Sequence, residues 1–387
     1  MKLASRVENL ISSPTLAISA KIKTLKAAGK DIVGFGAGEP DFDTPDFIKQ
    51  AAIEAINSGF TRYTPSSGIP ELKQAIIDKF QRENNLKYTS EQIVVSSGAK
   101  HSLFNIIQAL CEEGDEVIIP APYWVSYPEM VKFSGAGPVI VHTTAINNFK
   151  VKPKELFSAI TPKTKLIILN SPSNPTGSLY HKEELEDIAR IAVGHNIFVI
   201  SDEIYERLVY EQQEYISIAA LNSKIYDLTI TVNGVSKSFA MTGWRIGYCA
   251  ARREIAQAIA KIQDHSTSNP VSISQKAALA ALGGSDRCVK EMRDEFQKRR
   301  DFMVKKIAGI KKLCCTKPEG AFYIFCDISK TGLSARDFAM RLLEEKFVAV
   351  VPGEGFGSDK HIRLSFATSL DNIKKGLERI EAFIASL

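Results

Sequence analysis

The chain has 387 residues, of which 44% are hydrophobic and 24% are charged, and its formal net charge is +5. This composition is typical of an ordinary globular protein of roughly two or three domains. It excludes a disordered chain, which needs low hydrophobicity together with high net charge. Basic residues alternate with acidic ones, as in the stretch 290–295, so we expect no one-sided basic surface for nucleic acid.

No stretch approaches the ~18 consecutive apolar residues that a membrane span requires, and the first residues lack the pattern of a signal peptide. The six cysteines lack metal-ligand spacing and are too sparse for a disulfide scaffold, which favours reduced thiols. We therefore expect a cytoplasmic protein without a membrane anchor or a metal site.

Short apolar runs rich in Val and Ile alternate with helix-like stretches through the middle of the chain. Most runs lack in-out alternation, which is typical of a mostly parallel sheet covered on both faces by helices. The predicted strands are 92–96, 116–119, 138–141, 165–169, 197–200, 228–232 and 246–250. The predicted helices between and after them are 101–112, 182–193 and 254–262.

This alternation predicts an α/β fold with a large domain over residues 45–285. Few crossovers remain after it, and the pattern predicts a smaller α+β domain over residues 286–387. Its expected elements are helices at 291–307 and 335–345 and strands at 321–327, 348–351 and 361–366. Residues 1–44 contain one helix-like stretch, 16–28, and could pack on either domain.

Unusual polar residues collect at the carboxyl ends of the predicted strands, where ligands of an open α/β sheet bind. After the first strand, Gly98, Ala99 and Lys100 open a helix, whose free N–H groups would suit a phosphate. A plain tight turn is the alternative. The spacing excludes a Walker loop, and Gly34-x-Gly36-x-Gly38 is followed by Glu-Pro rather than by a helix.

Two later strand ends carry further candidates. Asn174 lies in a rigid turn with two prolines and a glycine, where its amide could face a ligand oxygen or serve the turn alone. Asp202 ends a buried strand, so its carboxylate needs a cation or a donor. A helix cap is the simple interpretation of Asp202, and a counter-ion for a protonated heterocyclic nitrogen is the functional one.

Lys237 lies between small residues and an apolar run, where burial would lower its pKa and prepare the amine for imine chemistry. Arg245 follows in a Trp-Arg-Ile-Gly context that suits recognition of a phosphate or carboxylate. A structural ion pair between Lys237 and Asp202 is the alternative. A lysine, a carboxylate and a phosphate cradle with an arginine are together what pyridoxal phosphate (PLP) requires, so we predict PLP as the cofactor.

Six motifs resemble those of the class I aminotransferases of PLP fold type I, in particular the bacterial aspartate enzymes of the subgroup that also acts on prephenate. The resemblance extends over nearly the whole chain. The motifs are Ala-Gly-Glu-Pro-Asp-Phe-Asp-Thr-Pro at 37–45, Tyr-Trp-Val-Ser-Tyr-Pro-Glu-Met at 123–130, Asn-Pro-Thr-Gly at 174–177, Ser-Asp-Glu-Ile-Tyr at 201–205, Ser-Lys-Ser-Phe-Ala-Met-Thr-Gly-Trp-Arg-Ile-Gly-Tyr at 236–248 and Arg-Leu-Ser-Phe-Ala at 363–367.

The resemblance implies roles around the ring of the cofactor. Lys237 would hold PLP as an imine and move a proton as general acid–base, and Asp202 would pair with the pyridine nitrogen. Tyr205 and Asn174 would bind the phenolic oxygen. Trp124 would stack on the ring, and Trp124 and Asn174 would also contact the substrate.

It also implies how the phosphate is held. The backbone N–H groups of Gly98 and Ala99 would bind it together with Ser236 and Arg245. Tyr63 would reach the phosphate of the neighbouring subunit, so a homodimer is the expected partner arrangement.

For the substrate, Arg363 would hold the α-carboxylate with Gly38 beside it. Lys100 and Thr15 would read a second carboxylate. Taken alone, Arg363 could equally be a surface residue of an edge strand, Lys100 an exposed lysine and Thr15 a helix N-cap.

The expected activity is therefore transfer of an amino group between L-aspartate or glutamate and a 2-oxo acid such as 2-oxoglutarate or oxaloacetate. The reaction would be of the ping-pong type through pyridoxamine phosphate, and prephenate is a further expected substrate of the subgroup. The alternatives are an aminotransferase for aromatic or neutral amino acids and a PLP-dependent β-lyase or decarboxylase, because a fold does not fix the reaction. A nicotinamide dehydrogenase and an effector module of a regulator are more distant alternatives.

Overall fold

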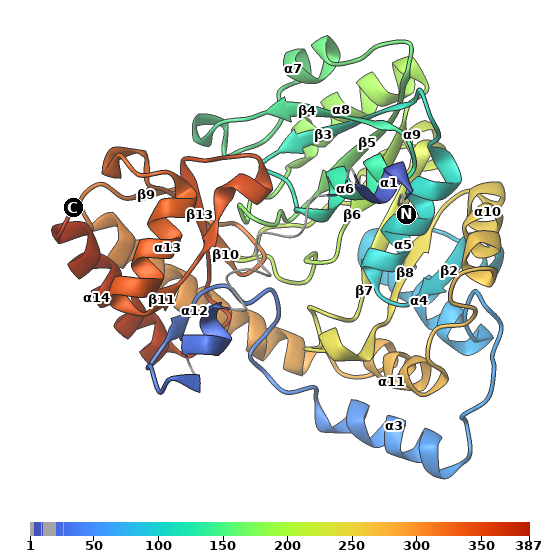
Figure 1. The fold of residues 1–387 in the computed structure, drawn as a ribbon. Coiled ribbons are helices and arrows are strands. Elements are labelled where there is room, and N and C mark those ends of the chain that lie inside the picture. The colour runs from blue at the N-terminus through green and yellow to red at the C-terminus, as the bar shows by residue number, and fades with distance from the viewer. Residues whose placement is uncertain (1–3, 9, 11–20, 26) are drawn as a thin grey trace.

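The computed structural model describes residues 4–8, 10, 21–25 and 27–387. Most of the first half of the predicted helix 16–28, and Thr15, lie outside these residues. Figure 1 shows a large part built on one wide sheet and a smaller part around β10, β13 and α12–α14. The α/β fold class with a mostly parallel sheet is confirmed.

The large sheet has seven strands in the order β2-β8-β7-β6-β5-β3-β4. Neighbouring strands are parallel except at β8, which is antiparallel to both β2 and β7. Every predicted strand of this domain is present, with ends within two residues of the prediction. The bounds are β2 (Ile93–Ser96), β3 (Glu116–Ala121), β4 (Gly137–His142), β5 (Thr164–Asn170), β6 (Phe198–Asp202), β7 (Thr229–Gly234) and β8 (Gly247–Ala250).

Helices cover both faces of this sheet, which explains why its strands lack in-out alternation. On one face, Val117 and Leu166 pack in a core with α5, α6 and α10. On the other, Ile118 and Ile167 pack against α8, and Ile93 packs against α4 and α11. The helices of the large part are α3 (Asp46–Asn57), α4 (Pro70–Asn84), α5 (Ala99–Leu110), α6 (Ser126–Phe133), α7 (Pro153–Ser158), α8 (Lys182–His195), α9 (Ser223–Leu228), α10 (Arg253–Asp264) and α11 (Ser272–Gly283).

The small part contains a four-stranded antiparallel sheet in the order β12-β13-β10-β9 and a parallel pair, β1 with β11. Its strands are β1 (Val33–Gly34), β9 (Cys314–Cys315), β10 (Tyr323–Asp327), β11 (Val348–Ala349), β12 (Val351–Pro352) and β13 (His361–Ser365). Its helices are α12 (Arg287–Ala308), α13 (Ala335–Lys346) and α14 (Leu370–Ala385), and α1 (Ser5–Glu8) lies near α6 of the large part.

One prediction in the small part is wrong in detail. The stretch 348–351 was expected to be a single strand, but it divides into β11 and β12, which pair in different sheets. The reason is the N-terminal segment, because β1 supplies the partner of β11 and Phe35 is fully buried in the same core. The predicted division of the chain at residues 45 and 286 stays a prediction.

Three further observations concern the described residues as a whole. No helix among them combines the length and hydrophobicity that crossing a membrane requires. Within the same ranges, no group of three or more His, Cys, Asp or Glu side chains could hold a metal ion. The six cysteines are all free thiols.

Candidate active site

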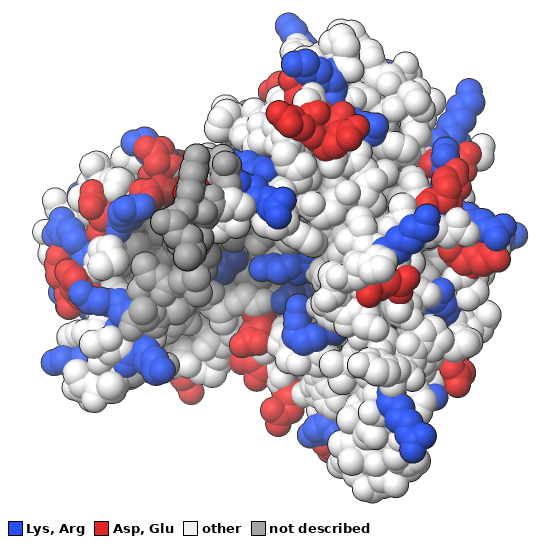
Figure 2. Space-filling model, turned by 45° about the vertical axis from the view of Figure 1, so that its right-hand side comes forward, with Lys and Arg blue, Asp and Glu red and all other residues white. Residues whose placement is uncertain are grey.

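A cavity of 570 Å³ opens at the carboxyl ends of the parallel strands, between the large sheet and the small part. Figure 2 shows a hollow in this face with Lys and Arg atoms on its floor. Of the predicted site residues that the structure describes, all line the cavity except Gly98 and Tyr63. Its lining consists of Gly36, Gly38, Ala99, Lys100, Leu103, Trp124, Val125, Ser126, Tyr127, Asn170, Asn174, Asp202, Ile204, Tyr205, Ser236, Lys237, Thr242, Arg245, Tyr323, Phe356 and Arg363.

Lys237 follows β7 and points its ammonium into the cavity, where Nζ donates to the carbonyl oxygen of Gly38 at 2.6 Å. Burial lowers the pKa of Lys237 to about 8, and the nearby guanidinium groups of Arg245 and Arg363 act in the same direction. A lysine with this pKa is about one-quarter neutral at pH 7.5, whereas an ordinary lysine is almost wholly charged. The site therefore prepares this amine as a nucleophile and a base.

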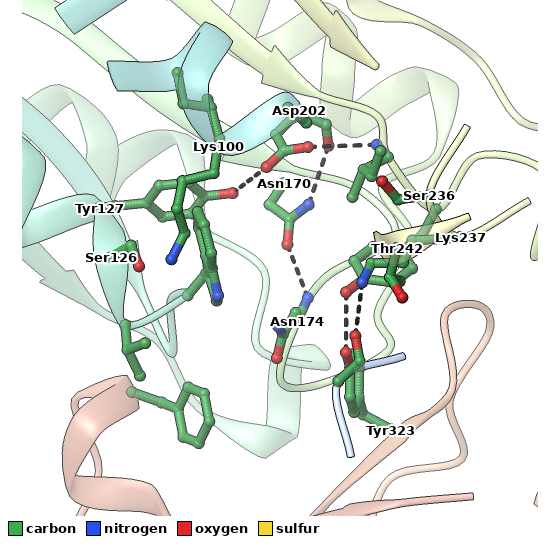
Figure 3. A pocket seen from close by; sticks show the side chains of 18 of the residues that line it. Lys100, Ser126, Tyr127, Asn170, Asn174, Asp202, Ser236, Lys237, Thr242 and Tyr323 are labelled. Carbon is green, nitrogen blue, oxygen red and sulfur yellow. Dashed lines mark hydrogen bonds between the residues drawn. The ribbon is translucent and has the colours of Figure 1, made fainter. Parts of the chain in front are cut away.

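Asp202 is the last residue of β6 and its side chain is buried. The phenol of Tyr127 donates to Oδ2 at 2.6 Å, and the N–H of Ile204 donates to Oδ1 at 3.3 Å. Burial raises the pKa of Asp202 to about 6, against the lowering effect of these hydrogen bonds and of Lys237. Figure 3 shows the carboxyl group between Tyr127 and the residues around Lys237. It is ionised near neutral pH and can accept a proton-bearing nitrogen of a ligand.

Residues 97–100, which we call the phosphate loop after their predicted role, lie at the start of α5 and contact Arg245. Arg245 has a left-handed backbone (φ 56°), and its guanidinium donates to the carbonyl of Thr242 at 2.9 Å and of Ser97 at 3.3 Å. A Cβ on Gly98 would lie 2.5 Å from Nη2 of Arg245, so a side chain there would displace the guanidinium, and the φ of +91° also favours glycine. The N–H groups of Ala99 and Lys100 are in the first turn of α5, where helix geometry provides no acceptor.

The N–H of Gly98 itself donates to the carbonyl of Ser96 at 2.7 Å. Its predicted role as a direct phosphate donor therefore stays a prediction. What the structure adds is a steric role, because a glycine at this position admits the guanidinium of Arg245.

Arg363 lies on β13 and is buried, with 5% of its surface exposed, so it is not a surface residue of an edge strand. Its guanidinium donates to Oδ1 of Asn174 at 2.9 Å and to the carbonyl of Gly36 at 3.0 Å. It lies 4.4 Å from the ring centre of Tyr323 and 5.1 Å from that of Phe356. Its Nε has no hydrogen-bond partner in the part of the chain that the structure describes. This buried cation suits a bidentate anion such as a carboxylate.

Lys100 and Trp124 lie together on another wall of the cavity. Nζ of Lys100 is 4.8 Å from the centre of the Trp124 ring. Burial lowers the pKa of Lys100, and the charge of Arg245 lowers it further. Trp124 packs edge-to-face against Tyr127, with ring centres 5.4 Å apart. A second anionic group of a ligand would relieve the desolvated charge of Lys100.

Gly98 and Tyr63 do not line the cavity, and Tyr63 is 90% exposed. Thr15 lies outside the described residues. Two unpredicted residues, by contrast, organise the site. Asn170 donates to the backbone oxygen of Asp202 at 3.0 Å and accepts from the N–H of Asn174 at 2.8 Å. The phenol of Tyr323 lies 3.0 Å from that of Tyr205.

Comparison with known proteins places this geometry in a family. The family "Aminotransferase class I and II" matches residues 30–380. The chain is a class I/II aminotransferase. An "Aspartate aminotransferase" of Bacillus sp. (strain YM-2) is 51% identical over 99% of both chains. An "Aspartate/prephenate aminotransferase" of Cereibacter sphaeroides is 48% identical over 100% of this chain and 99% of its own. The structure of a Thermus thermophilus aspartate aminotransferase with maleate is 45% identical, with a TM-score of 0.95 and 100% of both chains covered.

Aminotransferases of this family use PLP, and the site of this aminotransferase fits that cofactor. Because Gly98 has no side chain, the guanidinium of Arg245 comes close to the free N–H groups at the start of α5, and these groups suit a phosphate. Lys237, which follows β7 and has a lowered pKa, can react with the aldehyde of the cofactor. The buried carboxyl group of Asp202, at the end of the neighbouring strand β6, can pair with the pyridine nitrogen. The prediction of a PLP-dependent aminotransferase is thus confirmed.

Proposed function

We propose that this aminotransferase exchanges the amino group of L-aspartate or L-glutamate with 2-oxo acids such as oxaloacetate and 2-oxoglutarate. The observation that carries the proposal is the presence of two cations, Arg363 and Lys100, on the wall of one cavity. A dicarboxylic substrate can place one carboxylate on each, and a monocarboxylic substrate leaves Lys100 without a carboxylate to pair with. The relatives named for aspartate support the same assignment, as does the relative whose structure holds maleate.

Five residues would hold the ring of the cofactor. Asp202 would keep the pyridine nitrogen protonated with one carboxyl oxygen while Tyr127 holds the other. Tyr205 and Asn174 would donate to the phenolic oxygen, and Trp124 would stack on the ring. When bound, the protonated ring withdraws electrons from the substrate Cα–H bond and so acidifies it.

Two side chains and the first turn of α5 would hold the phosphate. Arg245 and Ser236 line the cavity beside the N–H groups of Ala99 and Lys100, and Gly98 leaves room for the guanidinium. The positive end of the helix dipole adds to this attraction. Phosphate binding there would orient the ring toward Lys237.

Lys237 would carry the chemistry of this chain. Its amine would hold the cofactor in the resting enzyme and would move the proton at the substrate Cα during the reaction. The lowered pKa lets Nζ accept this proton near neutral pH, and the carbonyl of Gly38 holds Nζ in place. Arg363 fixes the α-carboxylate with Gly38 beside it, and Lys100, helped by Thr15, orients the distal carboxylate.

We also propose a cytoplasmic homodimer in which Tyr63 reaches the cofactor phosphate of the neighbouring subunit. Its phenol is 90% exposed in the single chain, which is unusual for a tyrosine unless a partner covers it. The outer helix α3 also exposes Phe47, Ile53 and Ile56 by 40%, 47% and 53%, an apolar face that a second copy could bury.

The proposal is tested by a panel of half-reactions. The purified PLP enzyme is mixed with single amino acids, and its conversion to the pyridoxamine form is followed by absorbance. Aspartate and glutamate should convert it rapidly, and alanine and phenylalanine much more slowly at equal concentration. Equal or faster conversion by phenylalanine would favour the aromatic alternative. Cysteine is included in the panel, and its breakdown to pyruvate, ammonia and sulfide without conversion of the cofactor would favour a β-lyase. Prephenate is then offered to the pyridoxamine form, where regeneration of the PLP form identifies it as an acceptor.

A further inference from the structure

Behind the phosphate loop, a line of polar side chains runs through the protein toward the Tyr63 loop, which we define as residues 63–69. The N–H of Ser97 donates to Nδ1 of His101 at 3.3 Å. Nε2 of His101 lies 3.2 Å from Nδ2 of Asn105, and this amide lies 3.4 Å from Oε1 of Gln263. Gln263 then donates to the carbonyl of Ser66 at 2.6 Å. The line thus joins the phosphate loop to the Tyr63 loop.

The far end of this line is hydrogen-bonded to the edge strand of the large sheet. β2 is an edge strand, and Gln263 donates from the same Nε2 to the carbonyl of Val95 at 2.8 Å. The N–H of Val95 in turn donates to the carbonyl of Ser67 at 3.0 Å. The Tyr63 loop is therefore bonded to the strand that leads directly into the phosphate loop, and a movement of either shifts the other.

A second amide secures the same loop. Oε1 of Gln275 accepts from the N–H of Ile69 at 2.8 Å, and its Nε2 donates at 2.9 Å to Oγ1 of Thr64 and to the carbonyl of Pro270. Gln263 and Gln275 both have 0% exposure. Burying a polar amide costs free energy unless its hydrogen bonds are made, so these glutamines hold the loop in one arrangement.

The middle of the line consists of His101 and Asn105 on α5. His101 is half-buried on α5, and burial lowers the pKa of its imidazole, so the ring is neutral and accepts at one nitrogen only. Nδ1 accepts from the Ser97 N–H, and Nε2 then packs against the amide group of Asn105 without a hydrogen bond. Asn105 is fully buried one turn further on. Contacts of 3.2 to 3.4 Å are long for hydrogen bonds, so the coupling through them is modest.

We propose that His101, Asn105 and Gln263 are positioning residues that couple cofactor binding in the phosphate loop to subunit pairing through the Tyr63 loop. The inference rests on the proposed function, because it takes PLP in the loop and a homodimer in which Tyr63 crosses the interface. Occupation of the phosphate loop fixes Ser97, and the line transmits this order to Ser66. By linkage, PLP strengthens the dimer by the same factor by which dimer formation strengthens PLP binding.

The experiment measures the dimer dissociation constant with and without PLP by sedimentation of fluorescently labelled protein. The ratio of the two constants is the coupling. In the wild type we expect the PLP form to pair at least about ten-fold more tightly, which lies within the usual range of allosteric coupling. In His101→Leu this ratio should fall about five-fold or more. His101→Gln, whose amide can still accept from Ser97, should retain most of it.

Gln108→Leu is the matched control, because Gln108 lies on the same helix and its Nε2 has no hydrogen-bond partner among the residues described. Its ratio should equal that of the wild type. Asn105→Leu breaks the line at its midpoint and carries the same prediction as His101→Leu, so misfolding of one variant leaves the other as the test.

Two results would overturn the inference. One is a wild-type dimer whose strength does not depend on PLP. The other is a variant dimer weakened equally with and without PLP, because that is the effect of a merely structural residue. The half-reaction of the wild type with aspartate distinguishes these failures from failure of the proposed function, since it reports the chemistry of the site irrespective of the coupling.

Discussion

Replacing Lys100 by methionine should change which substrates the enzyme prefers rather than abolish its activity. Methionine keeps an unbranched stem of similar length and removes the charge. The ammonium of Lys100 is desolvated and lies 4.8 Å from the Trp124 ring, on the wall of the cavity that Arg363 also lines. A distal carboxylate would pair with it, whereas the side chain of alanine offers nothing to bind.

The expected magnitude has two parts. A charge-assisted contact contributes about 1.5–3 kcal/mol, which corresponds to about ten- to 150-fold in kcat/KM for aspartate and 2-oxoglutarate. Loss of the cation–π contact with Trp124 costs about 0.5–2 kcal/mol and affects every substrate equally. The ratio of kcat/KM for aspartate to that for alanine isolates the first part. This ratio should fall at least about ten-fold in Lys100→Met.

The assay is steady-state kinetics with aspartate and alanine, each paired with 2-oxoglutarate, over a range of pH. Because burial lowers the pKa of Lys100, the aspartate preference of the wild type should decline as pH rises through that lowered pKa, and the variant should lack this decline. Lys154→Met, on the exposed surface of α7, is the control and should match the wild type. If Lys100→Met slowed both substrates equally, Lys100 would serve the phosphate loop and not the distal carboxylate.

Three further substitutions probe the cofactor site. Cofactor-free Lys237→Met should be about 2 kcal/mol more stable than the cofactor-free wild type below pH 8. The pKa of Lys237 is about 8 in the folded protein and 10.5 in the unfolded chain, so the charged form disfavours folding in the wild type. Loss of the hydrogen bond to Gly38 offsets part of this gain. The gain should fade as pH rises from 8 to 10.5, as measured by urea midpoints, and persistence at pH 11 would refute this origin. Asp202→Asn should bind PLP but lose most activity, since an amide cannot hold the ring nitrogen protonated, and a near-normal rate would remove Asp202 from the mechanism. The added Cβ of Gly98→Ala would lie 2.5 Å from a guanidinium nitrogen of Arg245, so this variant should bind PLP about ten-fold more weakly or worse in a titration. Gly194→Ala is the control, because its Cβ would meet nothing within 4 Å, and its PLP affinity should be unchanged. Equal affinities of the two variants would show that the loop at Gly98 relaxes.

The strands of the large domain could be predicted from the sequence because they are buried on both faces and so appear as continuous apolar runs. The strand ends then brought Asp202, Lys237 and Asn174 to one edge, since parallel strands end together. Asn170 was predictable by the same logic, as the last residue of β5 beside the end of β6. Its role is not evident from the sequence, because an asparagine beside a proline-rich turn also suits the turn itself.

Other parts of the site depend on contacts that no local pattern records. Tyr127 follows Trp124 by one helical turn, but its bond to Asp202 joins two distant segments. Tyr323 meets Arg363 because β10 pairs with β13, and its contact with Tyr205 joins the small part to the segment after β6. The division of 348–351 between two sheets likewise depends on β1, which comes from the opposite end of the chain.

The central claim is that PLP is bound covalently to Lys237, and chemical trapping tests it most directly. The PLP-loaded enzyme is reduced with borohydride and digested, and the peptide that carries the phosphopyridoxyl group is located by mass spectrometry. We predict a single labelled peptide with the group on Lys237, together with loss of transamination and of this label in Lys237→Ala. A label on a different lysine of the wild-type enzyme, or unchanged turnover by Lys237→Ala, would contradict the account.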